Sequence, residues 1–187
     1  MMKESKATKF NKKASDSKSK PDQILETLAL QSGQNIADIG AGGGYFSLRF
    51  ANAVGRKGKV YAVDIDPGFL EFIRDDARAK GLSNVKTILA TEDKLVLRKK
   101  SLDFVFVRNV YHHLRKRMEY FKKLKGLLKP KGKVVIIEYK CGGLFSFHRI
   151  FGHYVPRETI VKEMKGAGYR LENEYNFLPD QSFTIFS

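Results

Sequence analysis

Cysteine is almost absent from this sequence, since Cys141 is the only one among 187 residues. A single thiol cannot form a disulfide within the chain, and the cysteine and histidine residues lack the spacing of a zinc site. The sequence therefore predicts neither a disulfide framework nor a bound metal. A chain of this length buries roughly two thirds of its unfolded surface as one domain without such crosslinks.

Long apolar runs are also absent. The longest uninterrupted ones, such as Val134 to Ile137, are far shorter than the roughly 18 residues that a membrane helix requires. The lysine-rich start does not contain the apolar core of a signal peptide. We therefore expect a cytoplasmic protein without a transmembrane segment.

Acidic residues are scarce relative to basic ones: 20 Asp and Glu stand against 35 Lys and Arg, a formal net charge of +15. Such a charge attracts nucleic acid, anionic lipid or an acidic partner, although a solvated surface gives the same composition. Residues 1–20 hold seven lysines and few apolar side chains, with Phe10 as the large one. We expect this basic tail to be disordered.

From residue 21 onward, short β-branched runs alternate with amphipathic stretches, which predicts a parallel sheet. One helix is indicated by the apolar spacing of residues 114–128, and another begins near Pro156. A turn at 178–180 joins the last two strand-like runs, which we expect to be antiparallel. The predicted parallel strands are 35–39, 59–64, 85–90, 102–108 and 133–139, and the antiparallel pair is 169–176 and 182–186.

The stretch 36–46 carries the most specific signal. A predicted strand runs into Gly40, Gly42 and Gly44 and then into an amphipathic helix, while a second strand ends at Asp64, twenty residues beyond Gly44. Glycines allow a tight turn and close approach of a ligand, and a helix start offers unpaired N–H groups to an anion. A carboxylate at the end of the second strand can accept hydrogen bonds from both hydroxyls of a ribose. The pattern predicts a site for a ribose-bearing cofactor.

An acid two residues before the first glycine, Asp38, distinguishes this motif from the dinucleotide pattern. The resulting D-x-G-x-G-x-G resembles the first motif of the class I S-adenosylmethionine methyltransferases. The resemblance continues through 60–66, 102–114 and 127–134, and covers about residues 35–140. Within that class, residues 108–110 and 135–139 are similar to the ubiquinone and menaquinone biosynthesis C-methyltransferases.

The resemblance implies a fold and a chemistry. The fold is α/β, with a Rossmann-like, doubly wound, mostly parallel seven-stranded sheet and an antiparallel last strand, in a domain covering 21–187. The cofactor is S-adenosylmethionine, with S-adenosylhomocysteine as its product. By the same resemblance, Asp38 orients the methionine amino group, Asp64 holds the ribose and Ile65 covers one face of adenine. The other implied cofactor residues are Gly40, Gly42, Gly44, Arg108 and Asn109.

Two of these assignments have alternatives. Asp64 lies close enough to Pro67 to act as a helix cap instead. Many relatives have an Asp-Ala pair just after the third strand, where this chain has Ala90-Thr91. We expect Thr91, Glu92 or Asp93 to take that role, and favour Glu92 because a loop tolerates a shift of one residue.

Methyl transfer from a sulfonium requires mainly that the protein hold acceptor and methyl group in line. Only an acceptor that loses a proton needs a base. Residues after the fourth strand lie where the topology of a parallel sheet places a ligand, which makes His112 or His113 the candidate catalytic base. We favour His112 because it is nearer the end of the strand. Packing or capping is the alternative role for a histidine at a helix start.

The expected substrate pocket contains Tyr111, His113, Phe147 and His148. The last two belong to the aromatic stretch 141–155, which occupies the position of a substrate lid. A helix that covers the sheet with ordinary core aromatics is the alternative.

The expected activity is methyl transfer to a small-molecule acceptor. RNA is the alternative acceptor because a basic surface binds phosphate, although the chain has neither an N-P-P-Y motif nor a Pro-Cys nucleophile. A protein that binds the cofactor without catalysis is the alternative from another class. The sequence leaves open the acceptor, the methylated atom, the role of the basic tail and the oligomeric state.

Overall fold

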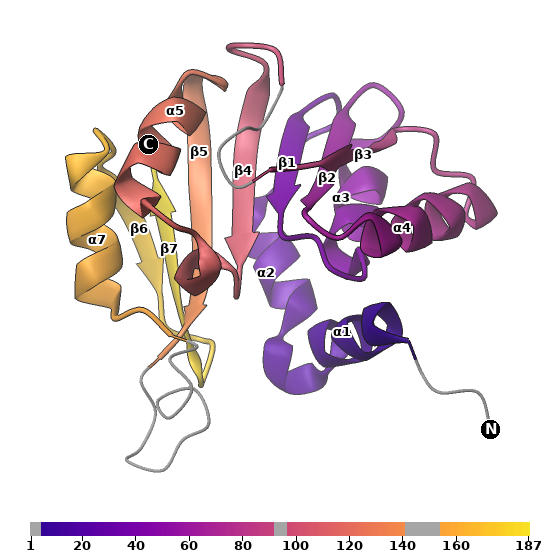
Figure 1. Cartoon of the computed structure of the whole chain (residues 1–187), viewed down its shortest axis with the longest axis horizontal. Helices are drawn as coiled ribbons and strands as arrows, with labels where there is room; N and C mark the ends of the chain where they lie inside the picture. The colour runs from indigo at the N-terminus through magenta and orange to yellow at the C-terminus, as the bar shows by residue number, and fades with distance from the viewer. Residues whose placement is uncertain (1–4, 92–96, 141–153) are drawn as a thin grey trace. The chain divides into compact units, whose positions relative to one another are not determined.

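The chain folds into two units, residues 1–91 and 92–187, which we call the N-terminal and C-terminal units (Figure 1). A computed structural model describes residues 5–91, 97–140 and 154–187. Almost all of the predicted lid 141–155 therefore lies outside the described residues.

Three parallel strands form the sheet of the N-terminal unit. β1 pairs with β2 and β2 with β3, in registers that place Asn35 opposite Lys59 and Val60 opposite Val85. The middle of each of the first two strands is buried and apolar, as parallel strands covered on both faces require. The predicted strands 35–39 and 59–64 are confirmed, and the third ends one residue earlier than predicted. The strands are β1 (Asn35–Ile39), β2 (Lys59–Asp64) and β3 (Val85–Leu89).

Local signals fix where the helices of this unit begin. Asp66 caps α4, because its Oδ1 accepts a hydrogen bond from the backbone N of Gly68 at 2.8 Å, and Pro67 occupies the first turn. Asp66, rather than Asp64, is thus the helix cap near Pro67. The helices after the first twenty residues are α2 (Pro21–Leu28), α3 (Tyr45–Val54) and α4 (Pro67–Ala79).

Residues 5–20 are structured, so the prediction of a disordered tail was wrong for this part of the chain. Helix α1 (Lys6–Ser15) is followed by the 3-10 turn η1 (Ser17–Ser19). The Ser5 side chain caps α1 by accepting from the backbone N of Thr8 at 3.1 Å. Ala7 and Ala14, seven residues apart, are buried on one face, while the lysines lie on the exposed face. The helix was missed because the many lysines of this segment outweighed its two buried alanines.

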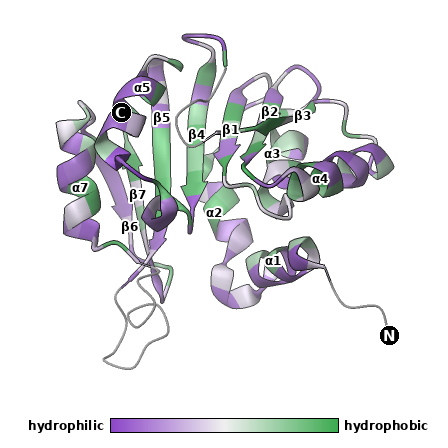
Figure 2. Cartoon of the chain, in the orientation of Figure 1, coloured by the Kyte–Doolittle hydropathy of each residue, from purple (hydrophilic) through white to green (hydrophobic). Residues whose placement is uncertain are grey.

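The C-terminal unit contains parallel and antiparallel pairs. β4 and β5 are parallel, whereas β7 runs antiparallel to both β5 and β6, as predicted for the last strand. In Figure 2 the strands β4 and β5 are largely hydrophobic, while α5 and α7 carry hydrophilic stretches. The strands are β4 (Leu102–Arg108), β5 (Leu128–Tyr139), β6 (Leu171–Tyr175) and β7 (Gln181–Phe186), and the helices are η2 (Tyr111–His113), α5 (Arg117–Lys125) and α7 (Arg157–Gly166).

One predicted helix, 114–128, is shorter in the structure. The backbone of Lys116 has φ 45°, a left-handed conformation that separates η2 from α5. At the other end, Leu128 already pairs with Leu102, so β5 begins before the predicted residue 133. The apolar spacing correctly indicated a helix, since Phe121 and Leu124 are buried. The same spacing continued across the turn at Lys116 and into β5, so the predicted helix was too long.

The strand order is β3-β2-β1 within the N-terminal unit and β4-β5-β7-β6 within the C-terminal unit. This confirms the Rossmann-like, mostly parallel α/β fold with an antiparallel last strand. Within 5–91, 97–140 and 154–187, no helix combines the length and the apolar character needed to cross a membrane.

Candidate functional site

A loop of glycines connects β1 to α3 in the N-terminal unit. Gly40, Gly42 and Gly44 have φ values of 71°, 55° and 81°, conformations that favour glycine. The Gly40 N–H donates to the carbonyl of Val63 at 2.8 Å, which ties the loop to the end of β2. At Gly44, a Cβ would come within 2.5 Å of Ile73 on α4. Backbone geometry and close packing therefore both demand glycine here.

Asp64 lies at the end of β2 against this loop. Its Oδ2 accepts a hydrogen bond from the Gly42 N–H at 2.8 Å, and its Oδ1 accepts from the Asp66 N–H at 3.1 Å. These two bonds fix the carboxylate, and only 8% of the residue is exposed to solvent. The next residue, Ile65, is 70% exposed. A carboxylate fixed by hydrogen bonds can bind a ribose, and an exposed apolar side chain next to it can pack against the attached aromatic base.

Asp38 is buried near the end of β1, with 4% exposure. The Ser47 hydroxyl on α3 donates to Asp38 Oδ2 at 2.6 Å, a short bond as expected for an ionised acceptor. Ser47 was missed by the sequence reasoning, because a serine inside an amphipathic helix has no pattern of its own. The bond keeps the Asp38 carboxylate in one orientation at the start of the loop.

The third-strand position is described only in part. Thr91 is exposed and lies two residues beyond the end of β3. The favoured Glu92 and its neighbour Asp93 lie outside the described residues. The choice among the three therefore stays a prediction.

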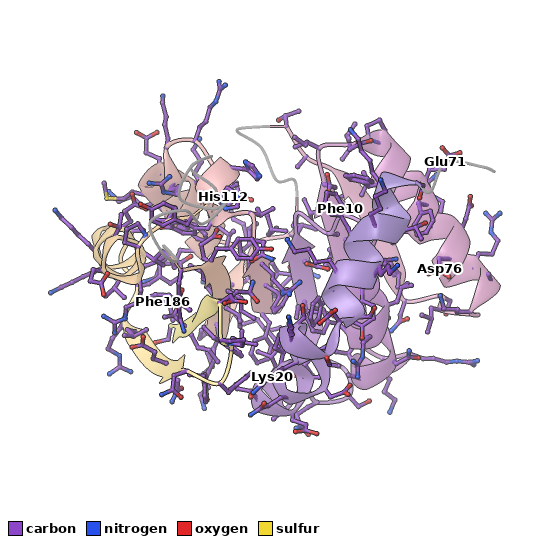
Figure 3. All side chains as sticks on the ribbon, turned by 90° about the horizontal axis from the view of Figure 1, so that it is seen from below. Phe10, Lys20, Glu71, Asp76, His112 and Phe186 are labelled. Atoms are coloured by element: carbon purple, nitrogen blue, oxygen red, sulfur yellow. The ribbon has the colours of Figure 1, made fainter. Side chains whose placement is uncertain are left out.

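His112 and Glu138 form a buried pair in the C-terminal unit. His112 Nδ1 lies 3.0 Å from both carboxylate oxygens of Glu138, and the His112 backbone N–H donates to Glu138 Oε2 at 3.1 Å. The side chains are 5% and 0% exposed. Glu138 lies on β5, 26 residues further along the chain, so only the fold brings the pair together. Figure 3 labels His112, which belongs to the turn η2.

The position of Glu138 beside Nδ1 bears on the tautomer of the histidine. If Nδ1 carries the proton that Glu138 accepts, Nε2 is the basic nitrogen of the ring. The Tyr139 backbone N–H donates to Glu138 Oε1 at 2.8 Å, which holds the carboxylate from its other side. The adjacent His113 is exposed, and its ring centroid lies 4.0 Å from that of His112.

Asn109 follows β4 in a left-handed conformation, with φ 56°. Its Nδ2 donates to the Tyr139 hydroxyl at 2.9 Å, and its Oδ1 accepts from the Gln181 side chain. The amide is thus held by Tyr139 of β5 and Gln181 of β7. The sequence did not indicate either residue as a partner of Asn109. Arg108, the other residue expected at the cofactor, is the half-buried last residue of β4.

Tyr111, which was predicted to line the substrate pocket, is held inside the C-terminal unit, and its place in that pocket stays a prediction. The residue is completely buried, its ring stacks on Phe121 at 5.4 Å, and its hydroxyl donates to Glu163 at 2.7 Å. Burial, together with this bond, raises the pKa of Tyr111 above its usual value. Arg117 donates to both oxygens of Glu163 at 2.7 and 2.8 Å, and this bond lowers the pKa of Glu163. Tyr111 therefore joins η2 to α7 through its bond to Glu163.

A cavity of about 320 Å³ lies beside the ends of β5 and β6 in the same unit. Charges on its wall are balanced, because Lys140 and Arg157 stand against Glu158 and Glu174. Arg157 donates to Glu174 at 2.8 Å. Its lining differs from the predicted pocket, of which Phe147 and His148 lie outside the described residues. The residues that line it are Tyr139, Lys140, Pro156, Arg157, Glu158, Glu174, Tyr175, Asn176 and Ser182.

Comparisons with known proteins identify the family of the sequence. Residues 37–136 match the family model described as a methyltransferase domain. The chain is 26% identical over 133 residues to the demethylmenaquinone methyltransferase of Geobacillus kaustophilus, covering 71% of the chain and 57% of that protein. It is 27% identical over 157 residues to the ubiquinone/menaquinone biosynthesis C-methyltransferase UbiE of Haemophilus ducreyi, covering 83% and 60%. The chain thus spans less than two thirds of the length of these relatives.

Solved structures show the same fold. A methyltransferase from Aquifex aeolicus described as SAM-dependent has a TM-score of 0.85 at 23% identity, with 98% of each chain covered. The [4+2]-cyclase SpnF has a TM-score of 0.75 at 15% identity, covering 91% of this chain and 79% of its own. Because a cyclase shares the fold, the fold alone does not decide the reaction.

Proposed function

The chain belongs to the methyltransferase domain family, and from this premise we propose that it transfers a methyl group from S-adenosylmethionine to a small-molecule acceptor. The observation that supports this best is the held carboxylate of Asp64, hydrogen-bonded to the glycine loop at Gly42 and followed by the exposed Ile65. That set fits a ribose and an adenine. When bound, the donor supplies an electrophilic methyl group.

Residues of the N-terminal unit hold the donor. Asp64 accepts hydrogen bonds from the ribose hydroxyls, Ile65 packs on adenine, and Asp38 faces the methionine amino group. The glycines Gly40, Gly42 and Gly44 allow the loop to approach the methionine closely. Arg108 and Asn109, in the C-terminal unit, stay as donor contacts inferred from the family resemblance.

His112 acts as the general base when the acceptor loses a proton. Glu138 accepts the Nδ1 proton and orients the ring, so that Nε2 takes the proton from the acceptor. The same carboxylate stabilises the imidazolium that forms. This proposal is supported by the two 3.0 Å distances and by the complete burial of Glu138, since a buried carboxylate strongly prefers a partner that can become cationic.

The cavity of the C-terminal unit suggests the class of acceptor. Tyr139 and Tyr175 contribute aromatic surface, while Arg157 and Glu174 neutralise one another. Such a wall favours a compact, uncharged, ring-bearing molecule over a polyanion. The names of the relatives, which refer to menaquinone and ubiquinone, indicate the same class of molecule. We propose a quinone-like or phenolic ring as the acceptor.

RNA remains an alternative acceptor because of the net charge of +15, and it is an outcome of the test below. A cytoplasmic location also belongs to the proposal. It is tested by separating cell membranes from the cytosol and detecting the chain in each.

The proposal is tested first by calorimetric titration of S-adenosylmethionine and S-adenosylhomocysteine into the purified protein. We expect one site per chain for each ligand. Cell extract with donor labelled on the methyl group is then separated into small-molecule, RNA and protein fractions. Label in the small-molecule fraction is the expected result.

Two outcomes contradict the proposal in different ways. Failure of both ligands to bind removes the donor site and leaves a protein with the fold but another role. Binding with label that nuclease releases assigns RNA as the acceptor instead.

A further inference from the structure

Helix α1 contacts the glycine loop through Asn11. The Asn11 Nδ2 donates to the carbonyl of Gly43 at 2.8 Å, and its Oδ1 accepts from the backbone N–H of Tyr45 at 3.1 Å. One amide thus bonds the backbone on both sides of Gly44. The Tyr45 N–H belongs to the first turn of α3, where N–H groups have no partner within the helix. Asn11 caps α3 from another helix, because Gly44 has no side chain to do so.

The backbone of α1 lies close to the loop as well. A Cβ on Gly43 would overlap the carbonyl oxygen of Ala7 and Oδ1 of Asn11. Gly43 does not have a positive φ, so it is glycine because α1 approaches it, whereas its neighbours Gly42 and Gly44 need glycine for their conformation.

Phe10 extends the same contact toward α4. A Cβ on Gly42 would meet the Phe10 ring at 3.3 Å, and the ring packs edge-on against Phe69 with centroids 5.5 Å apart. Figure 3 labels Phe10 on α1. Phe10 is nevertheless 50% exposed, so its contacts involve one side of the ring. The helix is therefore fixed to the loop at two neighbouring residues, Phe10 and Asn11.

We propose that Asn11 is a positioning residue for the methyl donor and that α1 is part of the donor site. This rests on the proposed donor binding by the glycine loop. Asn11 fixes the backbone of Gly43 and Tyr45, next to the Gly42 N–H that holds Asp64. A loop ordered before binding does not lose that freedom when the ligand arrives. The basic segment at the start of the chain thereby gains a role in cofactor binding.

Linkage gives the proposal a second consequence. If docked α1 strengthens donor binding, the donor must stabilise docked α1 by the same factor. The amides of the second half of α1, around Asn11 and Ala14, should exchange more slowly with solvent when S-adenosylhomocysteine is bound. A helix that merely packs on the surface, without coupling to the site, shows no such protection.

The test is calorimetric titration of S-adenosylhomocysteine into wild type, Asn11→Ala and a matched control, Asn52→Ala. Asn52 is an exposed residue of α3 whose amide donates to its own helix, at the Leu48 carbonyl. We expect Asn11→Ala to weaken binding about 10-fold, the scale of lost hydrogen bonds. Asn52→Ala should stay within about 2-fold of wild type. Thermal unfolding confirms that each variant is folded at the titration temperature.

Each outcome has one meaning. Equal affinities of Asn11→Ala and wild type, or equal losses in Asn11→Ala and Asn52→Ala, overturn the inference. No binding by wild type overturns the proposed function instead. If Asn11→Ala does not fold, Asn11→Asp replaces it: the carboxylate still accepts from the Tyr45 N–H but cannot donate to Gly43, and wild-type affinity in that variant contradicts the proposal.

Discussion

The two units hold their candidate functional residues in different ways. In the N-terminal unit, the glycines and Asp64 lie at the ends of β1 and β2 and are held by backbone N–H groups and neighbouring turns, while Asp38 is held by the Ser47 hydroxyl only nine residues away. In the C-terminal unit, His112 and Asn109 depend on side chains 26, 30 and 72 residues away. The first kind of site survives most distant substitutions, whereas the second is sensitive to every partner in its network.

The contrast has one exception, which is α1. Asn11 reaches Gly43 across 32 residues of sequence and adds a long-range side-chain contact to a loop otherwise held locally. Substitutions in the two units can show whether residues held by local contacts and residues held by distant side chains differ in their effects on binding, turnover and stability.

The largest effect is expected for His112→Ala in the C-terminal unit. Loss of the base should reduce turnover about 100-fold for an acceptor that must lose a proton, the lower end of general-base contributions. Affinity for S-adenosylhomocysteine serves as the control for an intact donor site. Turnover within 2-fold of wild type at all pH values would remove His112 from the reaction.

Asp64→Ala is expected to weaken donor binding by about 2 kcal/mol, roughly 30-fold, because a charged hydrogen-bond acceptor is lost. Asp66→Ala is the matched control two residues away. It removes the cap of α4 and should lower stability by about 1 kcal/mol with little change in affinity. A larger affinity loss in Asp66→Ala than in Asp64→Ala would contradict the assigned roles. Calorimetry and thermal unfolding measure the two quantities.

Gly43→Ala is expected to weaken donor binding about 10-fold, because its Cβ would displace α1 from the loop. Gly126→Ala is the control, since a Cβ there meets only the Lys123 carbonyl at 3.5 Å. Hydrogen exchange should show faster exchange of the α1 amides in Gly43→Ala alone. Unchanged affinity together with unchanged exchange would show that the loop tolerates the extra carbon.

The smallest effect is expected for Glu163→Gln, which disrupts the bidentate bond from Arg117 and should cost about 1 kcal/mol of stability at neutral pH. Because the pKa of Glu163 is lowered in the folded state, its contribution is fully present above the ordinary value of 4.5 and is lost as the pH falls through the lowered pKa. Chemical denaturation at several pH values should show the two proteins converging in acid. Glu158→Gln, on the same helix and exposed, is the matched control.

The strands could be predicted from the sequence more accurately than the helices. Five of the strand positions follow from apolar runs such as 134–137, because burial on both faces leaves little freedom in composition. The helix around 121–124 was found but extended too far, since apolar periodicity continues through the left-handed turn at Lys116. Helix α1 was missed because seven lysines in residues 1–20 outweigh two buried alanines in any composition-based judgement.

The sequence by itself determined the parallel sheet, the glycine loop and the acid that ends β2, because tight turns and buried strands restrict which residues can occupy those positions. Only the tertiary structure decided that Glu138 would orient His112, that Tyr111 would be enclosed by Phe121 and Glu163, and that Asn11 would cap α3. Those contacts join distant segments of the chain. No local pattern encodes them, since each depends on where two separate elements meet once their apolar faces are buried.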